Sequence, residues 1–146
     1  MTGTDKTRPQ VSVRIPAPTS IELSGPAVPH TVGAFRHRSR DFALDNGAEA
    51  RVAEDVALAV SEAVTNVVKH GYEQSEVGPV GLTASVADGF LEIAVTDHGL
   101  GFRDHDASGL GLGLAFIAEL SASLDISQSA RGTEIRMRFL LAGDAP

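Results

Sequence analysis

Residues 61–72 read SEAVTNVVKHGY and form the second half of a predicted amphipathic helix. The helix is expected over about residues 49–70, with Gly71 as its stop, because glycine favours the backbone conformation found just past helix ends. Three polar residues, Glu62, Asn66 and Lys69, lie beside its apolar face. That face consists of Val52, Val56, Ala59, Ala63 and Val67, which recur at helical spacing. A packing helix with a polar stripe is expected to border a cavity.

Length and composition favour one domain with a buried core, since the chain has 146 residues, 42% of them hydrophobic. The formal charge of -7 argues against nucleic acid as the main partner, because phosphates attract basic surfaces. The absence of Cys excludes disulfide and Cys–zinc frameworks. No apolar run approaches the roughly 18 residues of a membrane helix, and the N-terminus lacks a signal-peptide pattern. The simplest interpretation is a cytoplasmic protein that binds neither nucleic acid nor membrane.

The order of predicted elements indicates an α/β two-layer sandwich, a mixed and mostly antiparallel sheet with helices on one face. Asp88-Gly89 is typical of a two-residue hairpin turn between two of its strands. The predicted domain covers residues 19–142, with a tail at 1–18 that holds a short strand and another tail at 143–146. Periodicity predicts helices over residues 29–46, 49–70 and 111–122, and strands over 11–15, 20–23, 80–86, 90–97, 123–127 and 133–141.

Asp97 continues the period-two pattern of the apolar residues at 91, 93 and 95, so its carboxylate is expected on the core side at a strand end. A buried carboxylate is costly unless donors reach it. Gly99 and Gly101 follow at once and would let the backbone turn and a ligand approach closely. An exocyclic amino group, such as that of adenine, would suit this acceptor. The alternative is a structural Asp that closes an ordinary turn.

The segment 109–114 reads GLGLGL and leads into the next predicted helix. A helix N-terminus offers free N–H groups to a phosphate, and Gly109, Gly111 and Gly113 would keep side chains out of its way. The segment is not a P-loop, because no Gly-Lys-Ser/Thr follows. Glycine-rich helix starts also serve packing, so this signal is weak when taken alone.

Glu62 and Asn66 are one helical turn apart and lie on one side of their helix. An Asn oxygen can complete the shell of a Mg²⁺ ion held mainly by phosphates and water, and a nearby carboxylate can act as a base. A solvated polar stripe is the alternative. Thr133 is in phase with the apolar residues of the last strand, so its hydroxyl is expected to point inward and to need a partner.

In chain order these patterns are E-x-x-x-N on a helix, D-x-G-x-G after a strand, G-x-G at a helix start and Gly-Thr before a strand. In this combination the chain resembles the Bergerat ATP-binding fold of the GHKL superfamily, which gyrase-type and histidine-kinase ATPase domains share. The resemblance covers about residues 20–141. Within the superfamily, the short length and the stretch SEAVTNVVKHGYE are most similar to the bacterial anti-sigma-factor serine/threonine kinases.

The resemblance implies a role for each motif residue. Glu62 matches the catalytic carboxylate, Asn66 the Mg²⁺ ligand, and Asp97 the residue that reads adenine. Thr133 matches a residue that supports the adenine side of the pocket, and Arg103 is the implied second catalytic residue. The implied ATP-binding residues are Asn66, Lys69, Asp97, Gly99, Gly101, Gly109, Gly111, Gly113 and Thr133.

The segment between Gly101 and Gly109 matches the ATP lid of the family and is very short, with Arg103 as its only Lys or Arg. Phosphoryl transfer needs positive charge on the transferred oxygens. Arg103 could supply it, as could Lys69 or Arg131. If none reaches the phosphate, the protein would be a non-catalytic ATP-binding interaction module.

The resemblance also implies partners. The expected function is ATP- and Mg²⁺-dependent phosphorylation of a Ser or Thr on a STAS-type antagonist, with sequestration of a sigma factor. A homodimer through the N-terminal strand and helix is implied in the same way. A detached histidine-kinase ATPase domain fits less well, since no dimerisation helix with a phosphoacceptor His precedes the domain. A metal site around His98 and His105 is a further, weaker interpretation.

Overall fold

A computed structural model describes residues 18–73, 76–99 and 107–142 of the chain, with residues 107–110 described by their backbone alone. The strand expected at 11–15 and the two tails therefore lie almost wholly outside the described residues. The elements in chain order are β1 (Ser20–Pro26), α2 (Pro29–Asp45), α3 (Ala50–Asn66), the π-helical turn η1 (Val67–Gly71), β2 (Pro79–Ala87), β3 (Phe90–Asp97), α4 (Ala107–Leu120), β4 (Ser123–Ser129) and β5 (Gly132–Leu140).

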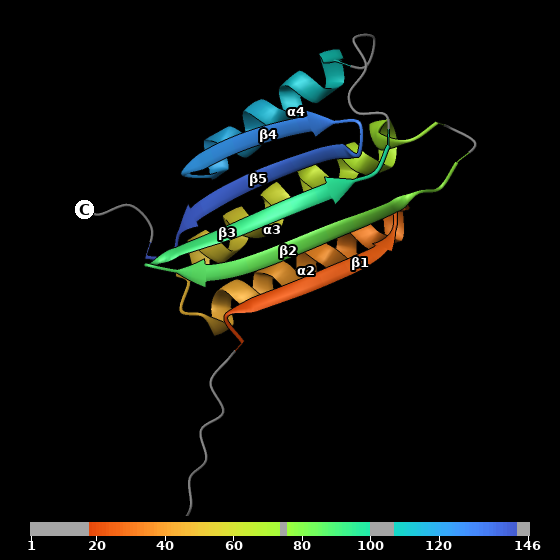
Figure 1. The fold of residues 1–146 in the computed structure, drawn as a ribbon. Coiled ribbons are helices and arrows are strands. Elements are labelled where there is room, and N and C mark those ends of the chain that lie inside the picture. The colour runs from red at the N-terminus through yellow and green to blue at the C-terminus, as the bar shows by residue number, and fades with distance from the viewer. Residues whose placement is uncertain (1–17, 74–75, 100–106, 143–146) are drawn as a thin grey trace, which may run out of the picture.

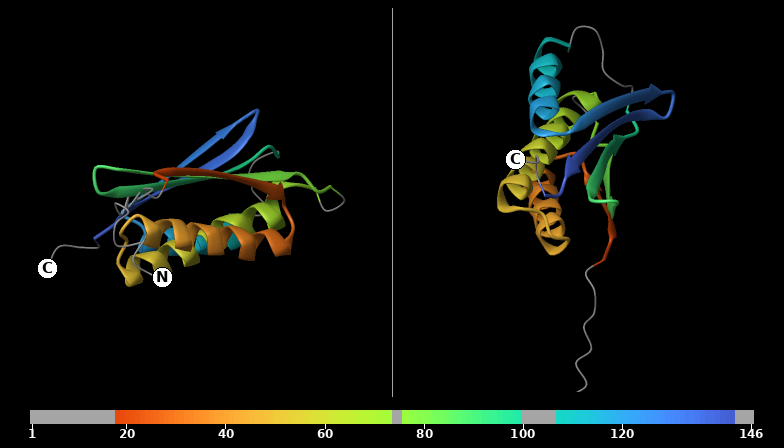
Figure 2. Two further views of the ribbon diagram at one scale, coloured as in Figure 1. Left: turned by 90° about the horizontal axis from the view of Figure 1, so that it is seen from below. Right: turned by 90° about the vertical axis from the view of Figure 1, so that its left-hand side faces the viewer.

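The five strands form one sheet in the order β1-β2-β3-β5-β4, and every neighbouring pair is antiparallel. Figure 1 shows the sheet in front with α2, α3 and α4 behind it. The view from below confirms that the helices lie together on one face of the sheet (Figure 2). The predicted two-layer architecture is therefore confirmed.

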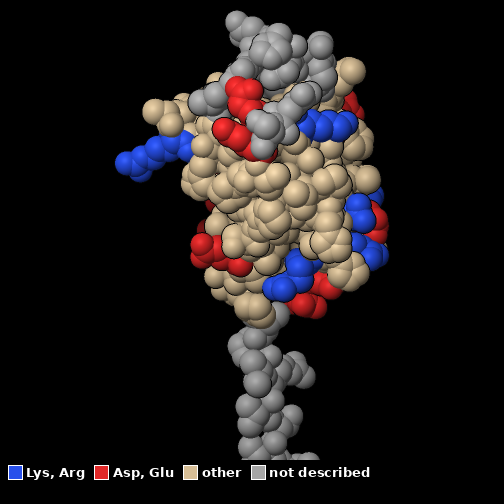
Figure 3. Space-filling view, turned by 90° about the vertical axis from the view of Figure 1, so that its right-hand side faces the viewer, with Lys and Arg blue, Asp and Glu red and all other residues tan. Residues whose placement is uncertain are grey.

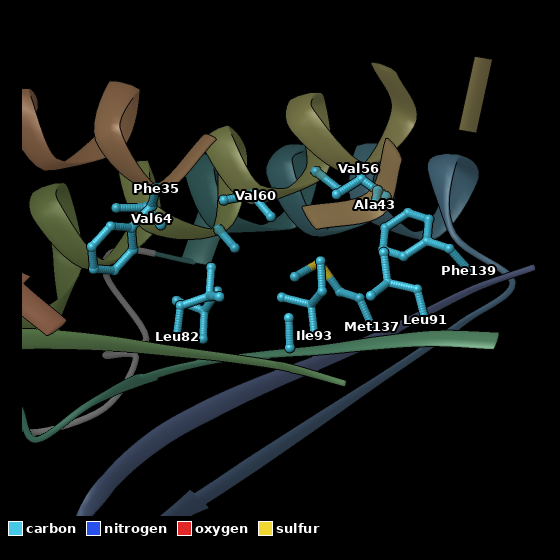
Figure 4. Close-up of a cluster of buried hydrophobic side chains, with 14 of the residues drawn as sticks. Phe35, Ala43, Val56, Val60, Val64, Leu82, Leu91, Ile93, Met137 and Phe139 are labelled. Carbon is cyan, nitrogen blue, oxygen red and sulfur yellow. The ribbon is translucent and has the colours of Figure 1, made fainter. Parts of the chain in front are cut away.

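The core lies between the helices and the inward face of the sheet. Figure 4 shows Val56, Val60 and Val64 of α3 pointing toward the strands, where inward side chains meet them. These three valines are fully buried, and Val56 belongs to the apolar face that the periodicity predicts. The other predicted members of that face are also buried, namely Val52, Ala59, Ala63 and Val67. The inward residues drawn from the sheet are Leu82, Leu91, Ile93, Met137 and Phe139, each at most 2% exposed. Burial of this aliphatic surface is the main term that stabilises the fold.

The turn between β2 and β3 has the geometry that its sequence predicts. Asp88 and Gly89 both have positive φ, 54° and 82°. Two consecutive left-handed residues make the turn whose twist matches that of the flanking strands. This turn sets the register in which Val80 lies opposite Asp97. The hairpin thereby places Asp97 at the end of a central strand.

Two boundaries differ from the sequence-based expectation. The helix predicted through residue 70 changes after Asn66 into the π-helical turn η1, which ends at Gly71. Helix α4 begins at Ala107, four residues earlier than expected, so Gly109, Gly111 and Gly113 lie within its first two turns. Within the described ranges, no helix has the length and apolarity needed to cross a membrane.

Candidate functional site

Four segments that are distant in sequence meet at one end of the molecule. They are η1, the end of β3, the first turns of α4 and the turn between β4 and β5, all at the right-hand end in Figure 1. Figure 3 looks onto this end and shows mostly uncharged residues with separate acidic and basic side chains among the described part of the chain. The described residues visible at this end therefore form no broad basic surface.

Asp97 is the central charged group of this end and is only 3% exposed. Its Oδ1 atom accepts the backbone N–H of Gly99 at 2.9 Å and that of Thr133 at 3.3 Å. Burial raises the pKa of the Asp97 carboxyl above its ordinary value, and the two N–H donors oppose this rise. The expected inward carboxylate at a strand end is confirmed, together with the donors that such a group requires.

Glycines allow the backbone to close around Asp97. A Cβ at Gly99 would lie 1.6 Å from the carbonyl oxygen of Gly71, and a Cβ at Gly132 would lie 1.9 Å from that of Asp97. Gly132 also has φ of +131°, which disfavours any other residue. A Cβ at Gly71 would lie 3.5 Å from Oδ2 of Asp97. The end of η1 and the start of β5 thus pack directly against the carboxylate and its turn.

The polar residues of α3 meet α4 at Gly113. A Cβ there would lie 3.3 Å from Oδ1 of Asn66 and 3.3 Å from the side chain of Glu62. Glu62 is half-buried, whereas Asn66 is 4% exposed. The structure therefore brings Glu62, Asn66 and Gly113 together, as the motif order predicts, and places the carboxylate where it remains accessible.

Two buried polar atoms of this end fit an adenine nucleotide bound with Mg²⁺. Within the described part of the chain, neither Nδ2 of Asn66 nor Oγ1 of Thr133 has a hydrogen-bond partner. Buried polar atoms of this kind call for a ligand or water. Nδ2 of Asn66 could donate to a phosphate oxygen, and the Oδ1 atom of the same amide is the kind of oxygen ligand that Mg²⁺ favours. Asp97 and Thr133 supply an acceptor and a hydroxyl on the other side, where the amino group of adenine would need them.

The remaining predicted site residues are placed less completely. Lys69 is exposed on η1, and Gly111 is exposed, with nothing within 4 Å of the position that a Cβ would take. Gly109 is described only as part of the α4 backbone. Gly101 and Arg103 lie outside the described residues, so their roles stay predictions.

The metal-site interpretation gains no support from the described residues. Among them, no group of three or more His, Cys, Asp or Glu side chains could hold a metal ion. His98 is exposed, and its Nδ1 lies 3.4 Å from the carbonyl oxygen of Arg131. His105, the second histidine of that interpretation, lies outside the described ranges.

Gly71, Tyr72 and Gly132 belong to this site although sequence reasoning gave them no site role. Gly71 serves as more than a helix stop, because it lies against Asp97 and Gly99. The sequence does place Gly71 and Tyr72 directly after the helix that carries the polar residues Glu62 and Asn66. The π-helical turn before it carries no sequence signal, although such turns are frequent at functional sites.

Comparison with known proteins gives this geometry a family context. The chain is 40% identical over 92 residues to a serine-protein kinase RsbW of Bacillus licheniformis, which covers 62% of this chain and 58% of that protein. It is 34% identical over 97 residues to an anti-sigma F factor of Clostridium botulinum, which covers 58% of this chain and 68% of that protein. The match thus spans less than two thirds of the RsbW relative. The expected similarity to anti-sigma-factor kinases is confirmed.

A solved structure and a family profile agree on the fold. The crystal structure of the RsbU and RsbW domains of Rv1364c from Mycobacterium tuberculosis superposes with a TM-score of 0.69 at 25% identity. The superposition covers 87% of this chain and 34% of that one. The profile of the histidine kinase-like ATPase domain matches residues 25–139. Because this match runs from the end of β1 through nearly all of β5 and takes in every motif described above, the chain belongs to the histidine kinase-like ATPase domain family.

Proposed function

We propose that the protein is a serine/threonine protein kinase that uses ATP and Mg²⁺, phosphorylates a STAS-type antagonist and sequesters a sigma factor. The observation that carries the proposal is the presence of two polar groups at one end of the molecule, Glu62 and Asn66 beside Gly113, and the buried Asp97 with Thr133. Relatives named serine-protein kinase RsbW and anti-sigma F factor support it.

These two groups suggest how a nucleotide would lie. Asp97 would accept a hydrogen bond from the adenine amino group, and the Thr133 hydroxyl would complete that side. Asn66 would hold Mg²⁺ through its side-chain oxygen, and the ion would neutralise charge on the phosphates. The first turns of α4 would face the phosphates with backbone N–H groups. Gly111 and Gly113 would keep that approach clear of side chains.

Glu62 is the proposed base for transfer. Its carboxylate would accept the proton of the target Ser or Thr hydroxyl. The hydroxyl oxygen would form the new bond to the γ-phosphorus while the bond to the ADP oxygen breaks, so that ADP leaves. Positive charge on the transferred oxygens would come from Arg103, Lys69 or Arg131. Lys69 and Arg131 are both exposed at this end of the molecule.

The partner proposals rest on similarity alone. A sigma factor and a STAS-type antagonist are the kinds of partner implied by the names of the relatives. Both would place the protein in the cytoplasm. A homodimer formed through the N-terminal strand and helix is proposed on the same ground, and neither nucleic acid nor membrane is a proposed direct partner.

The competing proposal is an ATP-binding interaction module that does not transfer phosphate. The short segment between Gly101 and Gly109 favours it, because a lid of this length leaves few groups to stabilise the transferred charge. The two proposals share the nucleotide site and differ only in chemistry. One experiment with two stages therefore separates them.

The first stage is calorimetric titration of ATP with Mg²⁺ into the wild-type protein and Asp97→Ala. Saturable binding that Asp97→Ala abolishes supports the site, whereas no binding by folded wild type would contradict both proposals. The second stage incubates the protein with labelled ATP and a panel of candidate STAS-type proteins. Transfer that Glu62→Gln removes supports the kinase, with Glu119→Gln on the exposed face of α4 as the matched control. Binding without transfer supports the interaction module.

A further inference from the structure

Tyr72, the only tyrosine of the chain, ties three segments of the site together. It follows η1 directly, so its backbone continues from Gly71. Its hydroxyl donates a hydrogen bond to the carbonyl oxygen of Pro79 at 2.5 Å. The same hydroxyl accepts the backbone N–H of His98 at 2.9 Å. One phenol oxygen thus links the end of η1, the start of β2 and the residue after β3.

The aromatic ring of Tyr72 is fixed by Gly78. A Cβ at Gly78 would lie 2.1 Å from two atoms of the ring, a distance that no real contact reaches. The ring therefore lies directly on the backbone of residue 78, just before β2. Its other contacts are with the apolar core, against which Tyr72 packs half-buried. These contacts fix the position of the ring, and the ring in turn places the hydroxyl between Pro79 and His98.

The bond to His98 acts on the turn that carries Asp97. His98 stands between Asp97 and Gly99, and the N–H of Gly99 is bound to Oδ1 of Asp97. On the other side, Nδ1 of His98 lies 3.4 Å from the carbonyl oxygen of Arg131. The middle residue of the turn is thus held from η1 on one side and from the β4–β5 turn on the other. Loss of either contact would remove one restraint on the position of this turn and its carboxylate.

We propose that Tyr72 is a positioning residue for adenine recognition, whose hydroxyl holds the turn at residues 97–99 so that the Asp97 carboxylate meets the amino group of the base. This inference rests on the proposed function, since it presupposes that Asp97 binds adenine. It adds a residue outside the four motifs. Tyr72 does not touch the nucleotide in this proposal and acts through His98.

Burial of the phenol is consistent with this use. It raises the pKa of Tyr72 above its ordinary value, and the nearby charge of Asp97 adds to the rise. The hydroxyl therefore keeps its proton at neutral pH, and so it can donate to Pro79 while it accepts from His98. A phenolate could not make the first of these two bonds.

The test compares ATP with purine riboside triphosphate, which carries the same phosphates and sugar but lacks the 6-amino group. We expect wild type to bind ATP at least tenfold more tightly. Tyr72→Phe keeps the ring on Gly78 and removes both hydroxyl bonds, and we expect it to weaken ATP binding by about tenfold. The affinity of Tyr72→Phe for purine riboside triphosphate should stay within about twofold of wild type, because this nucleotide has no 6-amino group to bond to Asp97.

Two further variants complete the design. Gly78→Ala places a methyl group where the Tyr72 ring now lies and so displaces the ring. It should therefore reproduce the loss of preference for ATP over purine riboside triphosphate. Ser121→Ala is the matched control, because it removes a hydroxyl bond to Ile117 at the far end of α4 and should leave both affinities unchanged. Melting temperatures of all variants show whether each remains folded at the temperature of the titration.

The outcomes distinguish the positioning role of Tyr72 from the adenine-binding role of Asp97. Equal weakening of both nucleotides by folded Tyr72→Phe would overturn the positioning role and leave a structural one. No change in either affinity would overturn it as well. Wild type that binds both nucleotides equally would show that Asp97 does not read the amino group, which overturns the adenine role of Asp97 and the inference with it.

Discussion

Oδ1 of Asp97 accepts the backbone N–H of Thr133 at 3.3 Å, although the two residues are 36 positions apart in the sequence. They lie opposite each other at the paired ends of β3 and β5. The same oxygen also binds the N–H of Gly99, while Oδ2 lies toward Gly71. One oxygen thus joins the carboxylate to the backbone of the site. The other lies toward Gly71 at the end of η1 and is the oxygen that we propose accepts the adenine amino group.

Asp97→Asn should stabilise the nucleotide-free protein at pH 7 and weaken ATP binding. Burial raises the pKa of this carboxyl in the folded state, so folding favours its neutral form. The stability that Asp97 contributes is therefore complete below its unfolded pKa and is lost as the pH rises through its folded pKa. At pH 7 the ionised group is a net cost, which the amide avoids while its oxygen still accepts two N–H bonds. Thermal unfolding at pH 7 and calorimetric ATP titration measure the two effects.

Unfolding of wild type and Asp97→Asn measured at several pH values provides the control for this prediction. The stability gain of Asp97→Asn over wild type should shrink as the pH falls from 7 toward 4, because the wild-type carboxyl becomes neutral. A gain that does not change with pH would show that the amide acts through packing instead. ATP affinity should fall by at least tenfold, in line with loss of a hydrogen bond to a charged acceptor.

ATP affinity of the wild-type protein should fall as the pH is lowered from 7 toward 5. A protonated Asp97 presents a hydroxyl in place of a second acceptor, and its raised pKa brings this change closer to neutral pH. Phosphate groups also titrate near pH 6. The ratio of the affinities for ATP and purine riboside triphosphate cancels that contribution. As the pH is lowered, this ratio should decrease in wild type and stay constant in Asp97→Asn. A constant ratio in wild type would argue against an ionised Asp97 as the adenine acceptor.

Sequence periodicity was sufficient for the layers and for the inward residues of the central strands. Val56 and Ala63 on α3 and Leu91 on β3 follow simple periods, and each is fully buried. The inward direction of Asp97 followed from the same period. These features depend on local geometry that repeats along one element, and so a single sequence contains them.

Features that depend on contacts between elements were not predictable in this way. The closeness of Gly132 to Asp97 depends on the register of β3 and β5, which no local pattern states. The π-helical turn before Gly71 and the early start of α4 at Ala107 depend on packing at the same end of the molecule. The role of Tyr72 emerges only once Pro79 and His98 are seen beside it.

Gly111→Ala should stabilise the protein and Gly113→Ala should not, although both lie in α4. A Cβ at Gly111 meets nothing within 4 Å, so alanine should stabilise the helix by about 0.5–1 kcal/mol. A Cβ at Gly113 would lie 3.3 Å from both Asn66 and Glu62, closer than such contacts usually are. That crowding should offset the helix gain and shift Glu62 and Asn66. Chemical denaturation compares the two variants under one set of conditions.

The functional half of this comparison concerns Mg²⁺-dependent ATP binding. Gly113→Ala should weaken it by about tenfold, because a shift of a few tenths of an ångström moves the proposed metal ligand Asn66. Binding measured with EDTA in place of Mg²⁺ should change less. Equal stabilisation by both alanines, with unchanged ATP binding, would show that Glu62 and Asn66 can adapt freely and that Gly113 is not required for the site.

Gly132→Ala should destabilise the protein far more than Gly47→Ala, although both glycines have positive φ. Gly47 has φ of +90° and open space where a Cβ would lie, so alanine there should cost only the backbone strain of about 1–2 kcal/mol. At Gly132 the same strain adds to a Cβ that would lie 1.9 Å from the carbonyl oxygen of Asp97. Relief of that clash requires β3 and β5 to separate where Asp97 binds Thr133. We therefore expect a loss above about 3 kcal/mol and no measurable ATP binding at temperatures where the variant remains folded. Denaturant titration measures the free energy of unfolding of both variants. Similar losses of stability would mean that the end of β3 can move to accommodate the added Cβ and that the Asp97–Thr133 contact does not fix the site.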